Sequence, residues 1–576
     1  MLSNIVLISA KYLILIFFAL FVLVSFKALS DVPDAEKKGS FKAQRVFILL
    51  MHFVCFLCIF IHADQEELSF TLGKAVIFYV MQLIYLVAMS CVIPAIVSLN
   101  KGLNNIMCMF IALAFVVQTR LGFDSEFKQF FILIGATVIF LIFVFFCKKA
   151  KFLKNLTWIY CICGLLLLVL VYVLAHVTKG AKLAIDLGFF SFQPMEFVKI
   201  IFVFFVAAAF NKANTFKTVF ITAVFAGLHI IILVLCTDLG SALILFVIYV
   251  IMVYVATKKF VYVLVGAVGF AAAAYVAWKL FSHVQIRVEA WLDPFANIND
   301  NGYQIAQSLF AIGTGGWFGT GILEGSPKLV PEVSNDMVFS AIAEEFGGIF
   351  CILLIALFLI FALMMMRVAI RVKIPFYKLL AFGLASVYGM QVFLNVGGTI
   401  KFIPLTGVNL PFISSGGSSL ISSMILIGII QALYVISESD VRKEREALAE
   451  GLDITEFSQD DIGKTAYEDD YYDEEDYLNE ETDYDENENY YDYEYYDDIR
   501  SNSKRKRKKA NDYFDDYEDD GLNNDFYDSK LNNDFYDRYG DYDYEEERDR
   551  EIEIKRNKKR DKKRKNRVRE YNSDDF

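Results

Sequence analysis

Long apolar runs separated by short polar segments dominate the first ~440 residues of the chain. Runs of about 20 apolar residues have the length that a helix needs to cross a bilayer core. We therefore predict an all-α polytopic membrane protein. The expected spans, about thirteen in number, are 5–27, 44–62, 75–98, 103–119, 127–147, 157–177, 194–211, 215–236, 239–257, 260–281, 337–366, 376–397 and 412–436.

A polar segment at 301–347 interrupts this apolar pattern. It ends a long predicted loop, 282–336, and Asp336 stands where the polar sequence gives way to an apolar run. Glu344 and Glu345 follow inside that run. Ionisable side chains within a bilayer are costly, so they mark candidate functional positions. Asp336 is therefore a candidate catalytic carboxylate at the membrane boundary; the alternative is that it caps the next helix.

A helix that starts near Asp336 would place Asp336, Ser340 and Glu344 on one face, descending about 12 Å. Partial screening from water favours the protonated form of a carboxyl, which suits a general base working near neutrality. For Glu344 and Glu345 the alternative is a structural pair bonded to neighbouring helices.

Basic residues orient the predicted spans, because positively charged loops stay on the cytoplasmic side. They follow odd-numbered spans, at Lys37, Lys38, Lys42, Arg45, Lys148, Lys149, Lys151, Lys154, Lys258, Lys259, Arg367, Arg371, Lys373, Arg442 and Lys443. This bias predicts an N-terminus and a 282–336 loop outside, with the C-terminal tail in the cytoplasm. Lys11 interrupts the first span, and the absence of a small-residue cleavage pattern predicts an uncleaved anchor.

The last part of the chain has a different composition, so the net charge of −12 describes neither part. Residues 441–576 are charged and Tyr-rich, and acidic blocks such as 467–498 alternate with basic blocks at 500–509 and 555–569. Such a sequence lacks the apolar surface for a core, which predicts a disordered tail. The tail is expected to bind anionic lipid or division or elongation proteins; the alternative is a solvated tether.

Several classes of site are disfavoured. The nine cysteines lie in or beside apolar spans, and the Cys55–Cys58 pair has no companion cluster, so buried structural cysteines are favoured over a metal site. The glycine run at 313–321 lacks the spacing of a nucleotide fingerprint and is typical of tight turns or of a re-entrant loop packed close to the bilayer. Neither a nucleotide nor a nucleic acid is expected as a ligand.

Four predicted outside junctions carry the polar residues that could recognise a phosphorylated substrate, because cations and helix N-termini stabilise phosphate oxygens. Lys199 is alternatively a snorkelling side chain or an ion-pair partner of Glu196, and Arg287 is alternatively a charge at the rim. The candidates are Lys179, Lys182, Asp186, Gln193, Glu196, Lys199, Asp238, Arg287, Glu289, Asp293, Gln304, Glu332, Asp336, Lys401 and the run Leu410 to Ser419.

Six short motifs follow one another along the chain: GAKLAIDLGFFSFQPMEFVK, TDLGSALILF, RVEAWLDPFAN, GYQIAQSLFAIGTGGWFGTG, VPEVSNDMVFSAIAEEFG and IPLTGVNLPFISSGGSSL. These motifs, in this order, resemble the SEDS family (shape, elongation, division and sporulation), which includes FtsW, RodA and SpoVE. The resemblance implies a ten-helix glycosyltransferase core at 103–440, three additional N-terminal helices within 1–102, and a tail at 441–576.

The resemblance further implies a peptidoglycan glycosyltransferase that polymerises lipid II at the outer face of a bacterial cytoplasmic membrane, for division or elongation. The family's essential acid falls on Asp336. Residues implied to contact substrate are Gln193, Glu196, Lys199, Asp238, Arg287, Gln304, Glu332, Glu344, Glu345, Lys401, Ser414, Gly416, Gly417 and Ser418. The chain departs from the family pattern at Ala184, Met195, Asn335 and Ser415, which affects details of substrate contact.

The implied partners are lipid II, the undecaprenyl-pyrophosphate-linked glycan and a class B penicillin-binding transpeptidase. A divalent cation, Mg²⁺ or Mn²⁺, is expected to assist departure of the pyrophosphate, although the sequence shows no dedicated metal cage. Two other functions are compatible with the same residues, because charges within membranes also line transport paths: a lipid II flippase, and a non-catalytic scaffold.

Overall fold

The computed structural model describes residues 2–30, 34–62, 70–149, 151–175, 184–186 and 191–449. Lys179, Lys182 and the predicted disordered tail beyond 449 lie outside the described residues, so those predictions are not tested. The fold below concerns the unit that spans Met1–Asp470.

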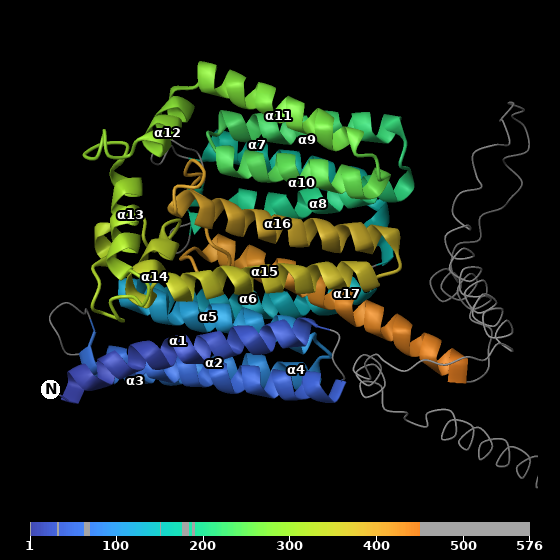
Figure 1. Ribbon diagram of the computed structural model, residues 1–576. Coiled ribbons are helices and arrows are strands. Elements are labelled where there is room, and N and C mark those ends of the chain that lie inside the picture. Colours follow the sequence, from blue (N-terminus) through green and yellow to red (C-terminus); the bar gives the residue numbers. More distant parts are fainter. Residues whose placement is uncertain are drawn as a thin grey trace, which may run out of the picture. The chain divides into compact units, whose positions relative to one another are not determined.

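The described chain is almost entirely helical (Figure 1). Ile185–Asp186 (β1) and Ser191–Phe192 (β2) form a short antiparallel ladder. The helices are α1 (Leu2–Leu29), α2 (Asp34–His62), α3 (Leu72–Val87), the π-helical turn η1 (Ala88–Val92), α4 (Ile93–Ile96), α5 (Lys101–Leu121), α6 (Phe123–Lys149), η2 (Lys151–Asn155), α7 (Thr157–Leu174), α8 (Pro194–Lys212), α9 (Phe216–Leu235), α10 (Leu239–Thr257), α11 (Val261–Leu280), α12 (Ser282–Leu292), α13 (Tyr303–Gly315), η3 (Pro327–Leu329), α14 (Val338–Phe346), α15 (Gly348–Arg371), α16 (Pro375–Thr399) and α17 (Gly417–Ala449).

Thirteen candidate membrane spans occur within the described residues. This confirms the predicted multi-pass all-α class. The third span is composite, because η1 interrupts it between α3 and α4. The helices of the polar loop, α12, α13 and α14, gather at the end of the bundle where α1 begins (Figure 1).

Two predicted span boundaries were wrong. The span expected at 337–366 is divided at Gly347, which has φ 89° and ends α14 before the membrane helix α15 starts. Glycine adopts this conformation at no steric cost, so it allows the chain to turn there. The span expected at 412–436 starts later, at Gly417, because the residues before it form a loop in which Phe412 has φ 66°.

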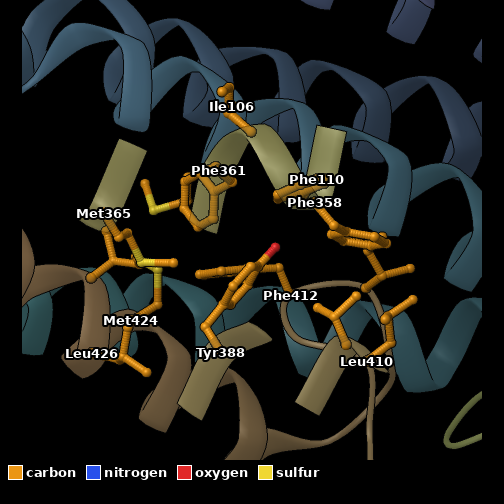
Figure 2. Packing of buried hydrophobic residues seen from close by; sticks show 14 of the residues in the cluster. Ile106, Phe110, Phe358, Phe361, Met365, Tyr388, Leu410, Phe412, Met424 and Leu426 are labelled. Atoms are coloured by element: carbon orange, nitrogen blue, oxygen red, sulfur yellow. The ribbon is translucent and has the colours of Figure 1, made fainter. Parts of the chain in front are cut away.

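The core is built around α5, whose membrane-spanning window is entirely buried. Phe110 of α5 stacks on Phe358 of α15 at 4.8 Å between ring centroids, and Phe361 packs edge-on against Phe412 at 6.2 Å. Tyr388 of α16 lies 5.1 Å from Phe361 (Figure 2). The aromatic rings therefore join the helices to the loop that precedes α17.

The additional N-terminal helices pack directly against this core. Phe18 of α1 stacks on Phe350 of α15 at 4.1 Å. A buried polar chain also crosses the interface: Gln44 donates to Ser25 Oγ at 2.9 Å, and Asn105 of α5 donates to Gln44 Oε1 at 2.9 Å. Buried amides that satisfy one another in this way define a specific arrangement of α1, α2 and α5.

Candidate active site

Asp336 lies in the loop that precedes α14. The helix begins at Val338 after the cap residue Met337, and no side chain caps it. Asp336 therefore does not cap α14, which was the alternative role that the sequence allowed for it. Its side chain is half-buried, and Oδ2 lies 3.8 Å from where a β-carbon on Gly407 would stand. Gly407 has φ 73°, which allows the loop 405–408 to turn beside the carboxylate.

The backbone of Asp336 is held from α16. Asn395 Nδ2 donates hydrogen bonds of 2.8 Å to the carbonyls of both Asp336 and Val408. One buried amide thus ties the start of α14 to the loop that passes beside it. Because both acceptors are backbone carbonyls, Asn395 holds the main chain at Asp336 and leaves the carboxylate out of these two bonds.

A second set of bonds fixes the residues just before Asp336. Gln118 Nε2 of α5 donates to Ser334 O at 3.0 Å and to Ile413 O at 2.9 Å. Ser414 Oγ donates to the Asn335 carbonyl, and the amide of Ser415 donates to Ser334 O at 2.7 Å. The run 410–419 therefore supports the segment that carries the carboxylate, which is how Ser414 enters the site.

Arg287 reaches the same loop from α12. Its Nη1 donates to Leu405 O at 3.1 Å, and its side chain is half-buried. Arg287 and Asp336 thus converge on 405–407 from two sides. A guanidinium held by one carbonyl keeps further donors for a phosphate oxygen.

A buried ion pair stands at the start of α8. Lys199 Nζ lies 3.0 Å from Glu196 Oε2, and the Lys199 side chain is 2 % exposed. Ser422 of α17 donates to the same carboxylate oxygen at 2.8 Å. Lys199 is therefore an ion-pair partner of Glu196, which was one of the alternatives that the sequence allowed.

Asp238 stands near this pair and caps α10 by accepting a 3.0 Å bond from the Ser241 amide. Burial raises the pKa of Asp238, while the Ser241 bonds and the Lys199 charge oppose that rise. The start of α10 also packs on the site loop, because a β-carbon on Gly240 would stand 2.8 Å from Thr406 O. The start of α10, which Asp238 caps, and Asp336 therefore have the loop 405–408 as a common neighbour.

The segment that precedes α8 and the serine- and glycine-rich run 414–419 meet at the start of α17. The backbone N–H of Gln193 donates to Ser418 Oγ at 3.0 Å, and Ser418 Oγ donates to Ser191 O at 3.0 Å. The Gly416 amide donates to Gln129 Oε1 at 3.2 Å, and Gly417 opens the helix. Two motifs that lie more than 200 positions apart in the chain are thus joined.

Glu344 and Glu345 do not share a face with Asp336, because Asp336 lies outside α14. Glu345 Oε1 accepts from Arg120 Nε at 3.0 Å and from the Leu323 amide at 3.3 Å. Glu344 Oε1 accepts from the Ser326 amide at 2.8 Å. Burial raises the pKa of Glu345 to about 7, although the Arg120 charge and hydrogen bond oppose this. Both carboxylates therefore tie the 320–326 loop to α14.

The glycine run packs against the same helix. A β-carbon on Gly315 would collide with the Ala343 carbonyl, and one on Gly319, which has φ 79°, would collide with the Glu345 carbonyl. The absence of a β-carbon at these positions therefore lets the run lie directly against the backbone of α14.

Three other candidates are Glu332, Gln304 of α13, and Lys401. Asn335 Nδ2 donates to Glu332 Oε2 at 2.8 Å, which places Glu332 beside the segment that carries Asp336. Gln304 donates to Pro331 O at 3.5 Å. Lys401 Nζ donates to the carbonyl of Leu292, the last residue of α12, at 3.2 Å and thereby joins its own loop to that helix.

The expected divalent cation would need a set of suitable protein ligands. Carboxylates such as Asp336 and Glu332 are the hard oxygen donors that Mg²⁺ and Mn²⁺ prefer. However, no group of three or more His, Cys, Asp or Glu suited to a metal occurs among the described residues. A protein-only metal site does not fit this donor set.

Sequence reasoning missed the side chains that support the site from within the spans. Gln118 and Asn395 hold the segment before Asp336 and its carbonyl, Gln129 holds Gly416, and Arg120 holds Glu345. Gln118, Gln129 and Asn395 are polar residues inside predicted apolar spans, and Arg120 directly follows the span predicted at 103–119. That anomaly was the available signal, because such residues face the bundle interior and pair there.

The chain is similar to known proteins in sequence. Residues 92–438 match the model of the FTSW_RODA_SPOVE family, described as cell cycle protein. The chain is 39 % identical over 275 residues to peptidoglycan glycosyltransferase RodA of Mycobacterium tuberculosis, covering 44 % of this chain and 57 % of that protein. It is 32 % identical over 357 residues to the probable peptidoglycan glycosyltransferase FtsW of Bacillus subtilis, covering 58 % and 87 %.

A solved chain from "Structural coordination of polymerization and crosslinking by a peptidoglycan synthase complex" has the same fold, with a TM-score of 0.51, 24 % identity, and coverage of 59 % of this chain and 99 % of that one. The match spans just over half the length of the mycobacterial relative, 57 %. The described helices and the family match over 92–438 lead to one conclusion: this chain is a multi-pass membrane protein that belongs to the FtsW/RodA/SpoVE (SEDS) family.

Proposed function

We propose that this protein is a peptidoglycan glycosyltransferase that polymerises lipid II into glycan strands, in cell division or elongation. The observation that carries the proposal is the half-buried Asp336 carboxylate, whose backbone is held by Asn395 and whose neighbouring loop is bound by Arg287. The two relatives described above, which are named peptidoglycan glycosyltransferase and probable peptidoglycan glycosyltransferase, support the reaction class.

The proposed reaction needs one base and one site for a leaving pyrophosphate. The 4-hydroxyl of the lipid II acceptor attacks the anomeric carbon of the growing strand, a new C–O bond forms, and the bond to the pyrophosphate breaks. Asp336 takes the hydroxyl proton. The Arg287 guanidinium stabilises charge on the departing undecaprenyl pyrophosphate.

In this proposal the other site residues hold neighbouring segments of the site in place. The Glu196–Lys199 pair is buried and internally neutralised, so it organises the start of α8 next to Ser418 and Ser422. A Mg²⁺ or Mn²⁺ ion is proposed to be carried mainly by substrate phosphate oxygens, since the described residues lack a protein cage. No step above depends on it.

The proposed site faces outward. The start of α1 and helices α12 to α14 lie at one end of the bundle (Figure 1). The basic loops that follow odd-numbered spans support a cytoplasmic opposite end and tail, in a bacterial cytoplasmic membrane. Lipid II would then be used after it has reached the outer leaflet. A class B penicillin-binding transpeptidase is the proposed partner, in line with the synthase complex named for the structural relative.

The test is glycan synthesis from lipid II by the purified full chain in vesicles. Asp336→Asn should reduce the rate about 10²–10⁴-fold, because the nearly isosteric amide cannot accept the proton. The control is Asp300→Asn, an exposed residue of the same loop, with thermal stability compared for both variants. Near-normal polymer from a folded Asp336→Asn protein would overturn the assignment. Translocation of labelled lipid II without polymer would instead identify a flippase, and neither activity a scaffold.

A further inference from the structure

A cavity of about 340 Å³ lies between the additional N-terminal helices and the loop that leads to α14. Small-molecule sites typically occupy ~300–1,000 Å³. One wall comes from α1, which precedes the family match over 92–438, and another comes from the 320–324 segment. The cavity is thus separate from the Asp336 site and belongs to the part of this chain that extends the family core.

The cavity has an apolar body and a polar rim. Leu7, Ile14, Leu15, Ile322 and Phe350 contribute to its apolar walls. Apolar walls of this kind take up apolar groups. Beside them, Ile8 and Tyr12 line the cavity and are 61 % and 45 % exposed. Since these side chains lie on a membrane-spanning helix, the mouth opens toward the bilayer, from which an apolar chain can enter.

The rim carries one cation that can pair with an anion. Of the two lining carboxylates, Glu345 is paired with Arg120 at 3.0 Å, and Glu324 lies 3.6 Å from His62, which is charged only when protonated. Lys11, which also lines the cavity, contacts no carboxylate among the described residues; its ammonium lies 5.8 Å from the Tyr12 ring centroid. It is therefore the lining cation whose charge is left for a ligand, and an ammonium binds phosphate well.

We propose that this cavity is an accessory lipid site, in which an apolar chain lies between α1 and α15 and the phosphate of its head group pairs with Lys11. Two kinds of amphiphile share this chemistry, a bilayer phospholipid and a polyprenyl phosphate. The inference does not depend on the proposed polymerase activity, because binding is measured without lipid II.

The experiment uses the purified full chain and native mass spectrometry. One arm supplies phosphatidylglycerol vesicles, a second supplies undecaprenyl phosphate, and a third supplies phosphatidylcholine as a zwitterionic reference. Lys11→Gln should weaken retention of the anionic amphiphile about fivefold, the factor that corresponds to ~1 kcal/mol for one near-surface cation. Leu15→Trp should abolish retention by filling the cavity.

The matched controls lie on α3 and α1. Lys74→Gln removes an exposed cation at the start of α3, and Leu13→Trp enlarges an exposed side chain of α1; neither residue lines the cavity. Both should bind like the unmodified protein. The arm with stronger retention identifies the source of the ligand. Equal retention by the protein and the Lys11→Gln and Leu15→Trp variants, equal binding of phosphatidylcholine, or no binding in any arm would each overturn the proposal.

Discussion

The side-chain amide of Asn395 donates a 2.8 Å hydrogen bond to the backbone carbonyl of Asp336, and a second 2.8 Å bond to Val408. The proposed base is therefore held by a residue of α16 that sequence analysis did not select. Positioning of this kind contributes strongly to catalysis, because a displacement of about 1 Å can cost ~10²-fold in rate.

Asn395→Ala should accordingly lower kcat for glycan synthesis by about 10–100-fold with little change in KM, because the base moves while substrate contacts persist. Stability should fall by ~1–3 kcal/mol, since two buried carbonyls lose their donor. Gln391→Ala is the control. This buried residue is one turn earlier on α16, and its Nε2 has no hydrogen-bond partner among the described residues. Equal losses in both variants would assign Asn395 a general structural role.

The Glu196–Lys199 pair should behave as one energetic unit. Lys199→Met leaves a buried carboxylate uncompensated and should cost ~3–5 kcal/mol, whereas the double variant Glu196→Gln/Lys199→Met should recover much of that loss. A double-mutant cycle on thermal unfolding measures the coupling, expected at ~0.5–3 kcal/mol. Arg371 and Glu438, 3.7 Å apart and half-exposed, form the reference pair, for which ~0–1 kcal/mol is expected. Equal coupling in the two cycles would contradict this prediction.

Glu345 should make stability depend on pH. Its folded pKa of about 7 lies above the ordinary value of 4.5, so the folded state binds more protons than the unfolded state between these values. Stability contributed by Glu345 is then complete below pH 4.5 and is lost as pH rises through 7. The thermal midpoint of the unmodified protein relative to Glu345→Gln should fall from pH 5 to pH 7.5, whereas Glu289→Gln, at an exposed position, should show no such trend. A constant difference would reject the shift.

A class B transpeptidase should co-purify from membranes with the chain and raise its rate of glycan synthesis. Contacts within the bilayer are the expected basis, because small-residue faces allow helices to approach closely. The measurement is recovery of a single-span transpeptidase from the native membrane, followed by its addition to the purified polymerase. Absence of such a protein, together with an unchanged rate on addition, would remove the partner from the proposal.

Truncation after Ser458 should leave glycan synthesis intact and alter localisation. Every proposed site residue lies in the membrane unit, whereas the basic run 555–569 is suited to anionic lipid or an acidic partner. Such contacts should weaken at high salt, since the Debye length is already ~8 Å at physiological ionic strength. Lost synthesis by a correctly inserted truncation contradicts this division of roles, and unchanged localisation reduces the tail to a tether.

The sequence by itself determined the features that depend on local composition. Apolar runs of bilayer length identified the thirteen spans, and the polar segment that ends at Asp336 marked the candidate carboxylate. Motif order was enough to indicate the family, which the match over 92–438 confirms. These properties are readable because the cost of placing polar groups in hydrocarbon acts on each segment separately.

Only the tertiary structure decided which polar residues meet. Asp336 lies before the start of α14, whereas Glu344 and Glu345 on that helix bind the 320–326 loop, and Glu345 also binds Arg120. Asn395 joins segments 59 and 13 residues away, and Gln118 joins segments more than 200 residues away. Periodicity along one helix carries no record of such distant partners, because they are set by how the helices pack and by which buried donors need an acceptor.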